Sequence, residues 1–178
     1  MSNALIISTN YGTETDEIGK PLEALKEAGV ATTVASVDGG GIQTLGGDRT
    51  TGPVVDSDTT LADVTASDYD IVVIPGGTLN ADALRIDPDA QRIVRDAATA
   101  GTPVAAICHG PWLLVNTDLV VGKTLTSYPS LATDVTNAGG SWVDEEVSVD
   151  TTNGFTLITS RTPDDLPAFN RAVLDALA

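Results

Sequence analysis

The sequence contains a single cysteine and a single histidine in 178 residues. One cysteine excludes an internal disulfide and any site built from several cysteines. The sequence also lacks a run of about 18 consecutive apolar residues, so no segment is expected to span a membrane. The first ten residues, MSNALIISTN, have neither the basic segment nor the long apolar stretch of a secretory signal. We therefore expect a soluble, cytoplasmic protein.

Positive charge is also scarce, with 9 Lys and Arg residues against 25 Asp and Glu, which gives a formal net charge of −16. Repulsion at this charge argues against nucleic acid and anionic membranes as partners. The acidic residues are spread along the chain, a pattern typical of proteins adapted to a high-salt cytoplasm. There the Debye length falls to about 3 Å at molar salt and self-repulsion is screened. An ordinary acidic mesophile protein is the alternative. Lysine is limited to Lys20, Lys26 and Lys123.

Short apolar runs alternate with amphipathic segments, and no shift in composition divides the chain, so we expect one α/β domain over residues 1–178. A strand, a helix and a strand in succession predict right-handed parallel crossovers. The Gly-rich stretch 38–53 lacks a phosphate-loop motif and predicts a hairpin in which 54–55 pairs near 43–45. The pattern predicts strands at 4–8, 31–37, 69–74, 104–107, 123–127, 142–143, 147–149 and 155–160, helices at 14–28, 79–85, 89–100, 130–138 and 163–177, and a loop at 9–13.

The strand at 104–107 is wholly apolar and is followed by a sharp turn into a helix that begins at Pro111. Cys108 lies in this turn, with the small residues Ala106 and Gly110 two positions before and after it, as in a nucleophile elbow. We expect Cys108 to stand exposed at the carboxyl end of the sheet, with its thiolate favoured by the helix N-terminus. A buried, inert cysteine is the alternative.

A second turn, Pro75-Gly76-Gly77, ends the strand at 69–74 and is expected at the same edge of the sheet. Two glycines there leave backbone N–H groups that could act as oxyanion donors beside a nucleophile. A simple tight turn is the alternative.

Four segments carry a family resemblance: AAICHGPWLL at 105–114, TSYPS at 126–130, NAGGSWVDEEVSVD at 137–150 and LITSRTPDDLPAFNRA at 157–172. They resemble the PfpI-type intracellular protease and deglycase family, in the superfamily of the Parkinsonism-associated deglycase. The match runs nearly end to end. It implies a flavodoxin-like, mostly parallel sheet sandwiched by helices, related to class I glutamine amidotransferase domains.

The resemblance implies that Cys108 is the nucleophile, that His109 belongs to the catalytic set and that a carboxylate contacts the thiol. That carboxylate aligns with Glu17, with Glu14 as the alternative register. Beside a thiolate it is expected to be protonated and to act as a general acid or base. In the family an acid from a neighbouring subunit orients the histidine, and Asp82 matches it here, although the family often has Glu and this loop is one residue longer. A homo-oligomer, a dimer or a trimer of dimers, is therefore implied.

The implied function is a cofactor-free enzyme in which Cys108 attacks a reactive carbonyl such as methylglyoxal, or a glycated group, to form a hemithioacetal. Gly76, Gly77 and Gly110 would line the oxyanion and substrate site, with the N–H of His109 as a further donor. One alternative is an intracellular cysteine peptidase or amidase with an acyl-enzyme intermediate. Another is a non-enzymatic redox-stress sensor or chaperone that uses an oxidisable, low-pKa Cys108.

No metal site and no cofactor are expected. One histidine next to one cysteine falls short of a typical zinc ligand set. The acidic pairs Glu145-Glu146 and Asp164-Asp165 are expected to be solvated surface charges.

Overall fold

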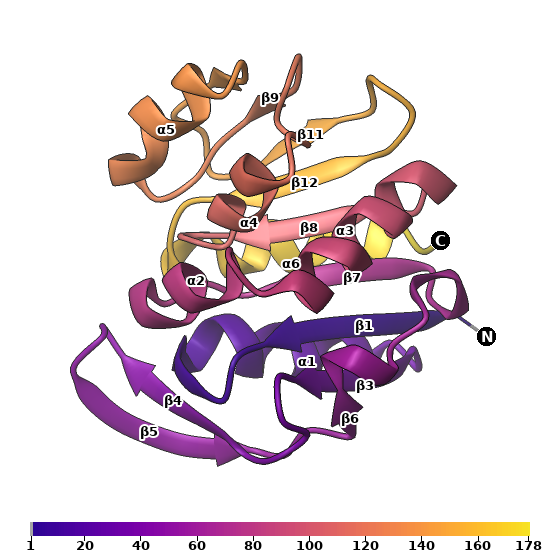
Figure 1. Cartoon of the computed structure of the whole chain (residues 1–178), viewed down its shortest axis with the longest axis vertical. Coiled ribbons are helices and arrows are strands. Elements are labelled where there is room, and N and C mark those ends of the chain that lie inside the picture. Colours follow the sequence, from indigo (N-terminus) through magenta and orange to yellow (C-terminus); the bar gives the residue numbers. More distant parts are fainter. Residues whose placement is uncertain (1) are drawn as a thin grey trace.

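The computed structural model of the chain describes residues 2–178 and has a central seven-stranded sheet between two layers of helices (Figure 1). Every neighbouring pair in this sheet is parallel except the edge pair β11–β12. The strands β3-β1-β7-β8-β12 have the order 2-1-3-4-5 of a flavodoxin-like fold, which confirms the predicted fold class. The full order is β11 (Ser148–Asp150), β12 (Leu157–Ser160), β8 (Val104–Ile107), β7 (Ile71–Ile74), β1 (Asn3–Ser8), β3 (Ala31–Ser36) and β6 (Thr59–Thr60).

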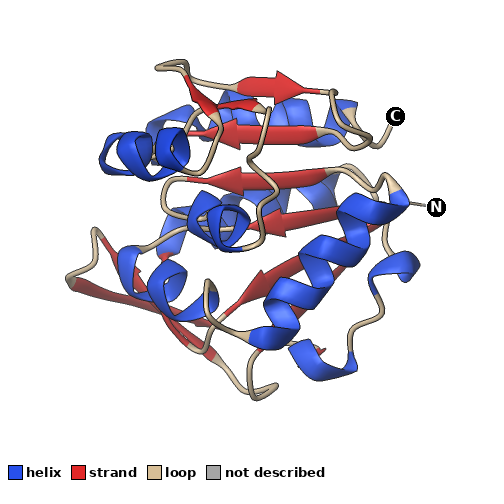
Figure 2. Cartoon of the chain, turned by 45° about the horizontal axis from the view of Figure 1, so that its top comes forward, coloured by secondary structure: helices blue, strands red, loops and turns tan. Residues whose placement is uncertain are grey.

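Both faces of the sheet are buried because its central strands are apolar at every position. In β1, Leu5 and Ile7 join one hydrophobic cluster, while Ala4 and Ile6 join the other. Helices lie on both faces of the sheet (Figure 2). The first cluster is covered by α2 (Thr78–Leu84), α3 (Pro88–Ala100), α4 (Pro111–Asn116) and α5 (Ala132–Asn137), and the second by α1 (Thr15–Glu27) and α6 (Leu166–Asp175). Within residues 2–178, no helix is long and apolar enough to cross a membrane. Short 3₁₀ turns are η1 (Leu61–Asp63), η2 (Ala66–Asp68), η3 (Pro129–Leu131) and η4 (Pro163–Asp165).

Two small sheets flank the main one. The predicted hairpin is confirmed as β4 (Ile42–Gly46) and β5 (Thr50–Val55), in which Gln43 pairs with Val54. The expected loop at 9–13 is wrong in part, because β2 (Tyr11–Glu14) pairs in parallel with β4. The expected strand at 123–127 is only β9 (Thr124–Leu125), which pairs with β10 (Ser141–Trp142) outside the main sheet. Both differences come from pairing with distant segments, which local composition does not encode.

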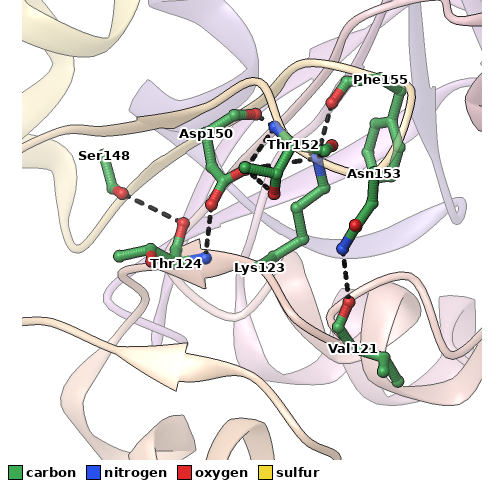
Figure 3. Close-up of polar contacts among 8 residues, drawn as sticks. All are labelled: Val121, Lys123, Thr124, Ser148, Asp150, Thr152, Asn153 and Phe155. Atoms are coloured by element: carbon green, nitrogen blue, oxygen red, sulfur yellow. Dashed lines mark hydrogen bonds and ion pairs between the residues drawn. The ribbon is translucent and has the colours of Figure 1, made fainter.

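A buried ion pair fixes the segment before β9 to the β11–β12 hairpin (Figure 3). The side chain of Lys123 is fully buried, with Nζ 3.4 Å from Oδ1 of Asp150 and 4.0 Å from the centre of the Phe155 ring. The ammonium also donates to the backbone carbonyls of Phe155, at 2.6 Å, and Thr152. Burial acts to raise the pKa of Asp150, but hydrogen bonds from Thr152 and Thr124 together with the charge of Lys123 hold it at about 2.

One expected surface charge is buried instead. Asp165 is 5% exposed, and its carboxylate accepts hydrogen bonds from Arg161 Nε and Nη2, both at 2.9 Å. The planar guanidinium matches both carboxylate oxygens, which compensates Asp165 for its loss of water. Asp164, Glu145 and Glu146 are exposed, as expected.

Candidate active site

Cys108 lies in a strained turn directly after β8, as the elbow pattern predicts. Its backbone φ is 62°, a left-handed conformation that is unfavourable by about 1–3 kcal/mol for a residue other than glycine. Three hydrogen bonds hold the turn: the N–H of Cys108 donates to Ser160 O at 3.0 Å, Tyr128 N–H donates to Cys108 O at 2.8 Å, and Gly110 N–H donates to Ile107 O at 2.9 Å. The side chain of Cys108 is therefore set by backbone contacts with β12 and with the segment after β9.

Two glycines assigned to the oxyanion site have a steric role instead. The N–H of Gly76 donates to Oε2 of Glu17 at 2.8 Å, and the N–H of Gly110 is used within the turn, so neither is free to bind an oxyanion. A Cβ at Gly76 would lie 2.8 Å from Cβ of Cys108, and one at Gly110 would lie 2.7 Å from the carbonyl oxygen of Ile74. Both positions require glycine because the backbones of β7 and the elbow approach so closely.

Glu17, in the first turn of α1, is the carboxylate beside the thiol. Its side chain is fully buried; Oε2 accepts the N–H of Gly76, whereas Oε1 has no hydrogen-bond partner among residues 2–178. Burial raises the pKa of Glu17 to about 8, against the opposing effect of hydrogen bonds with Cys108 and Gly76. Glu14, the alternative register, instead accepts the N–H of Gly47 at 2.8 Å. Glu17 is therefore mostly a neutral carboxylic acid at neutral pH, as expected for a carboxyl group placed beside a thiol.

The pKa of the Cys108 thiol is raised, which is opposite to the direction expected from the helix N-terminus. The expected exposure of Cys108 is also wrong, because the residue is only 7% exposed. Burial raises the pKa most, the charge of Glu17 raises it further once that carboxyl group ionises, and the N–H groups of Gly77 and His109 act to lower it. The helix that follows, α4, has only 6 residues, so its dipole is small. The resting site thus holds a protonated thiol beside a protonated carboxyl group, and Gly77 and His109 supply the N–H donors nearest the sulfur.

His109 turns back toward the nucleophile, with Nδ1 3.2 Å from Sγ of Cys108. Its ring stacks on Tyr128 at a centroid distance of 4.6 Å and meets Trp112 in a tilted arrangement at 5.2 Å. Burial lowers the pKa of His109, whereas the charge of Asp48 acts to raise it. A neutral imidazole next to the thiol can accept its proton.

A pocket of about 340 Å³ opens beside the thiol. The sequence did not point to Asp48, which lies in the turn between β4 and β5 and reaches the site from a distant part of the chain. Its carboxylate accepts the N–H of Thr78 at 2.8 Å and the hydroxyl of Thr78 at 2.5 Å. The Gly-rich composition around it indicated only a turn. The lining residues are Glu14, Glu17, Gly47, Asp48, Gly77, Thr78, Cys108, His109, Tyr128 and Pro163.

Two residues of α2 have contrasting positions. Asn80 is fully buried; its Oδ1 accepts the N–H of Thr9 at 2.8 Å and its Nδ2 donates to Gly76 O at 3.0 Å, which ties the ends of β1 and β7 together. No sequence signal singled it out. Asp82 is exposed and its side chain forms no hydrogen bond or ion pair within residues 2–178, so a single chain does not bring it to His109. Over the same residues, no group of three or more His, Cys, Asp or Glu side chains is placed to hold a metal ion.

A strained cysteine elbow, a buried acid in the first turn of the first helix and a flavodoxin-like sheet order together define a class of α/β proteins with a cysteine elbow. Comparison with known proteins gives the family. The chain belongs to the DJ-1/PfpI family, whose profile matches residues 2–176. It is 38% identical to Putative cysteine protease YraA of Bacillus subtilis, covering 99% of each chain. It is 37% identical to Protein/nucleic acid deglycase 2 of Escherichia coli, covering 98% of this chain and 96% of the relative. The crystal structure of Drosophila melanogaster DJ-1beta superposes with a TM-score of 0.87 at 34% identity, covering 100% of this chain and 91% of the other.

Proposed function

We propose that this protein is a cytoplasmic, cofactor-free enzyme in which Cys108 processes reactive carbonyl compounds, converting 2-oxoaldehydes such as methylglyoxal to hydroxy acids or releasing glycated groups. The observation that carries the proposal is Glu17, a fully buried acid with one unpartnered oxygen and a pKa of about 8 beside the thiol. Such a group can give and take a proton near neutral pH.

The reaction begins with addition of Sγ to the aldehyde carbon. The S–C bond forms, Glu17 gives its proton to the carbonyl oxygen and the thiol proton passes to Glu17 or to Nδ1 of His109, 3.2 Å away. The product is a neutral hemithioacetal. The N–H groups of Gly77 and His109 stabilise the oxygen as it gains charge.

The hemithioacetal then rearranges within the pocket. His109, neutral once any proton it took from the thiol has returned to Glu17, removes the proton from the former aldehyde carbon while Glu17 protonates the ketone oxygen, which gives an enediol. The proton on His109 then passes to the adjacent carbon and the hydroxyl of the sulfur-bearing carbon returns a proton to Glu17, which yields a thioester of Cys108. Water hydrolyses the thioester, which releases the hydroxy acid and restores the thiol. The net change is addition of one water to methylglyoxal to give lactic acid.

The proposal includes a second copy of the chain. His109 has no carboxylate hydrogen-bonded to it within residues 2–178, and Asp82 is an exposed acid with no partner there. A homo-oligomer that places Asp82 of one copy beside His109 of another would orient the imidazole. The substrate is proposed to be a small carbonyl compound or a glycated amino acid side chain, because the charge of −16 opposes approach to nucleic acid or anionic membranes.

A cysteine peptidase is the second candidate, favoured by the name of the Bacillus subtilis relative. An acyl-enzyme route needs His109 to protonate the leaving amine, but it does not need an acid that moves a proton between adjacent carbons. Glu17→Gln should therefore nearly abolish carbonyl processing and affect peptide hydrolysis less.

Lactate formation from methylglyoxal tests the proposal, measured with purified protein in molar KCl. Cys108→Ala and Glu17→Gln should each lower kcat/KM by roughly a hundredfold or more. Asp82→Asn should lower kcat/KM only if the oligomer places Asp82 of one copy beside His109 of another. Glu145→Gln, an exposed site outside the pocket, is the matched control. Folded wild-type protein without turnover would contradict the proposal and direct the search to peptide substrates.

A further inference from the structure

The pocket beside Cys108 is lined by acids and by no lysine or arginine. Three of its ten lining residues are the carboxylic acids Glu14, Glu17 and Asp48, of which Glu17 is protonated at neutral pH. None of the ion pairs formed within residues 2–178 includes any of these three acids. A ligand that enters the pocket therefore meets carboxyl groups and no compensating cation.

The acids at the pocket mouth are fixed by the β4–β5 turn. Glu14 accepts the N–H of Gly47, and Asp48 accepts both the N–H and the hydroxyl of Thr78. Asp48 holds a left-handed backbone conformation with φ 60°. Asp48 is exposed and Glu14 is half-buried, so both carboxylates lie at the solvent-facing mouth of the pocket, and each would lose these contacts if it moved away.

The floor of the pocket also points to the kind of ligand. Glu17 is fully buried and its Oε1 has no partner among the described residues, so it can bond to a hydroxyl or amino group of a ligand. An anionic group placed there would face Glu14 and Asp48 with no cation to balance it. Repulsion between an anionic ligand and these two carboxylates, which is strongest at low ionic strength, is one way to reject a wrong partner.

We propose that Glu14 and Asp48 make the Cys108 pocket selective by charge. The substrates are then neutral 2-oxoaldehydes, or carbonyl adducts carried on neutral or cationic groups, whereas compounds with a carboxylate or phosphate near the reacting carbonyl are rejected. The identity of the reaction rests on the proposed function above, but the charge selectivity itself does not.

Alkylation of Cys108 tests the selectivity without any need for catalysis. Iodoacetamide and iodoacetate have nearly the same size, and only iodoacetate is charged. Each forms an S–C bond with loss of iodide, and the thiol proton goes to the buffer. Because Cys108 is the only cysteine, intact mass reports its rate alone. N-acetylcysteine amide, a neutral small-molecule thiol, gives the intrinsic ratio of the two alkylation rates under the same conditions.

We expect the ratio of the iodoacetamide rate to the iodoacetate rate to be about tenfold or more higher for Cys108 of the wild-type protein than for the small-molecule thiol. Asp48→Asn and Glu14→Gln should each reduce this preference, and the double variant should approach the intrinsic ratio. Asn and Gln keep an oxygen to accept the N–H of Thr78 or Gly47. Glu145→Gln, exposed and outside the pocket, should behave as wild type. A wild-type ratio equal to the intrinsic ratio overturns the proposal whether or not the variants fold, and a ratio unchanged in the folded double variant does so as well.

A substrate pair separates this proposal from the proposed function. The neutral 2-oxopentanal and the anionic 4,5-dioxopentanoate are both 2-oxoaldehydes of similar length. Wild type should process the neutral compound with kcat/KM about tenfold higher or more, and Asp48→Asn should narrow the gap. Equal turnover of both would overturn the charge selectivity and leave the carbonyl chemistry standing. Turnover of neither, with a strong preference for iodoacetamide, would overturn only the proposed reaction.

Discussion

Replacing Glu17 by Gln should stabilise the protein while it removes activity. Glu17 is fully buried, and burial raises its pKa from 4.5 to about 8. In the unfolded chain the same group ionises near its ordinary pKa. The folded state therefore keeps this proton to a higher pH than the unfolded state does. Below about pH 4 the group is protonated in both states and costs no stability. The free energy of unfolding then falls as the pH rises through about 8.

The size of the effect follows from the two pKa values. One pKa unit corresponds to about 1.4 kcal/mol, so the shift from 4.5 to about 8 amounts to about 5 kcal/mol in all, and about 3.5 kcal/mol of this is lost from the free energy of unfolding between about pH 5 and about pH 8. The Cys108 thiol, whose pKa is also raised, does not ionise in this range. Gln stays neutral and can still accept the N–H of Gly76, so the variant should lack this part of the pH dependence.

Urea unfolding, followed by circular dichroism at fixed molar KCl over a pH series, measures the difference. Glu17→Gln and wild type should differ in stability by only about 1 kcal/mol near about pH 5, and the variant should be more stable by about 4 kcal/mol near about pH 8. Glu27→Gln, at an exposed position of the same helix, should follow wild type at every pH. Curves for Glu17→Gln and wild type that remain parallel across the series would refute the reasoning.

Two further predictions concern stability and packing. Lys123→Met should lower the free energy of unfolding by about 3–5 kcal/mol, because it leaves a buried carboxylate without its ammonium, whereas the exposed Lys20→Met should have little effect in the same urea assay. Gly110→Ala should lower stability by about 1–3 kcal/mol and reduce lactate formation, because the new Cβ would lie 2.7 Å from Ile74 O and displace the elbow. The control Gly19→Ala, with open space around it, should be neutral or slightly stabilising. Unchanged stability in Lys123→Met or unchanged activity in Gly110→Ala would contradict these accounts.

The sequence was sufficient to predict the elements whose signal is local. The apolar runs that became β7 and β8, the elbow geometry at Cys108 and the β4–β5 hairpin all depend on composition and spacing over a few residues. The placement of Glu17 came from the family resemblance, since a lone glutamate in a helix otherwise indicates a surface charge.

The remaining features depend on contacts between distant segments. Asp48 reaches the pocket because the β4–β5 hairpin pairs with β2, and Lys123 is buried by the turn that follows Asp150. Asp165 has the pattern of one of two adjacent surface acids, and only the fold shows that Arg161 bonds both its oxygens. The residues next to a charged side chain in the sequence do not show whether the fold will bury it against a partner.

The thiol of Cys108 illustrates where a local rule loses to the fold. The turn and the following helix predict a lowered pKa, but that helix has only 6 residues, while β7, α1 and the elbow together remove water from the sulfur and place Glu17 beside it. Desolvation and a neighbouring acid outweigh a short dipole. A thiol that stays protonated at rest becomes nucleophilic only when its proton can leave, and Nδ1 of His109 at 3.2 Å together with the Glu17 carboxyl group provides that route. Uncatalysed reactions of the resting cysteine, such as oxidation or alkylation, should therefore be slow, whereas a bound carbonyl that takes a proton from Glu17 should accelerate the reaction at Cys108.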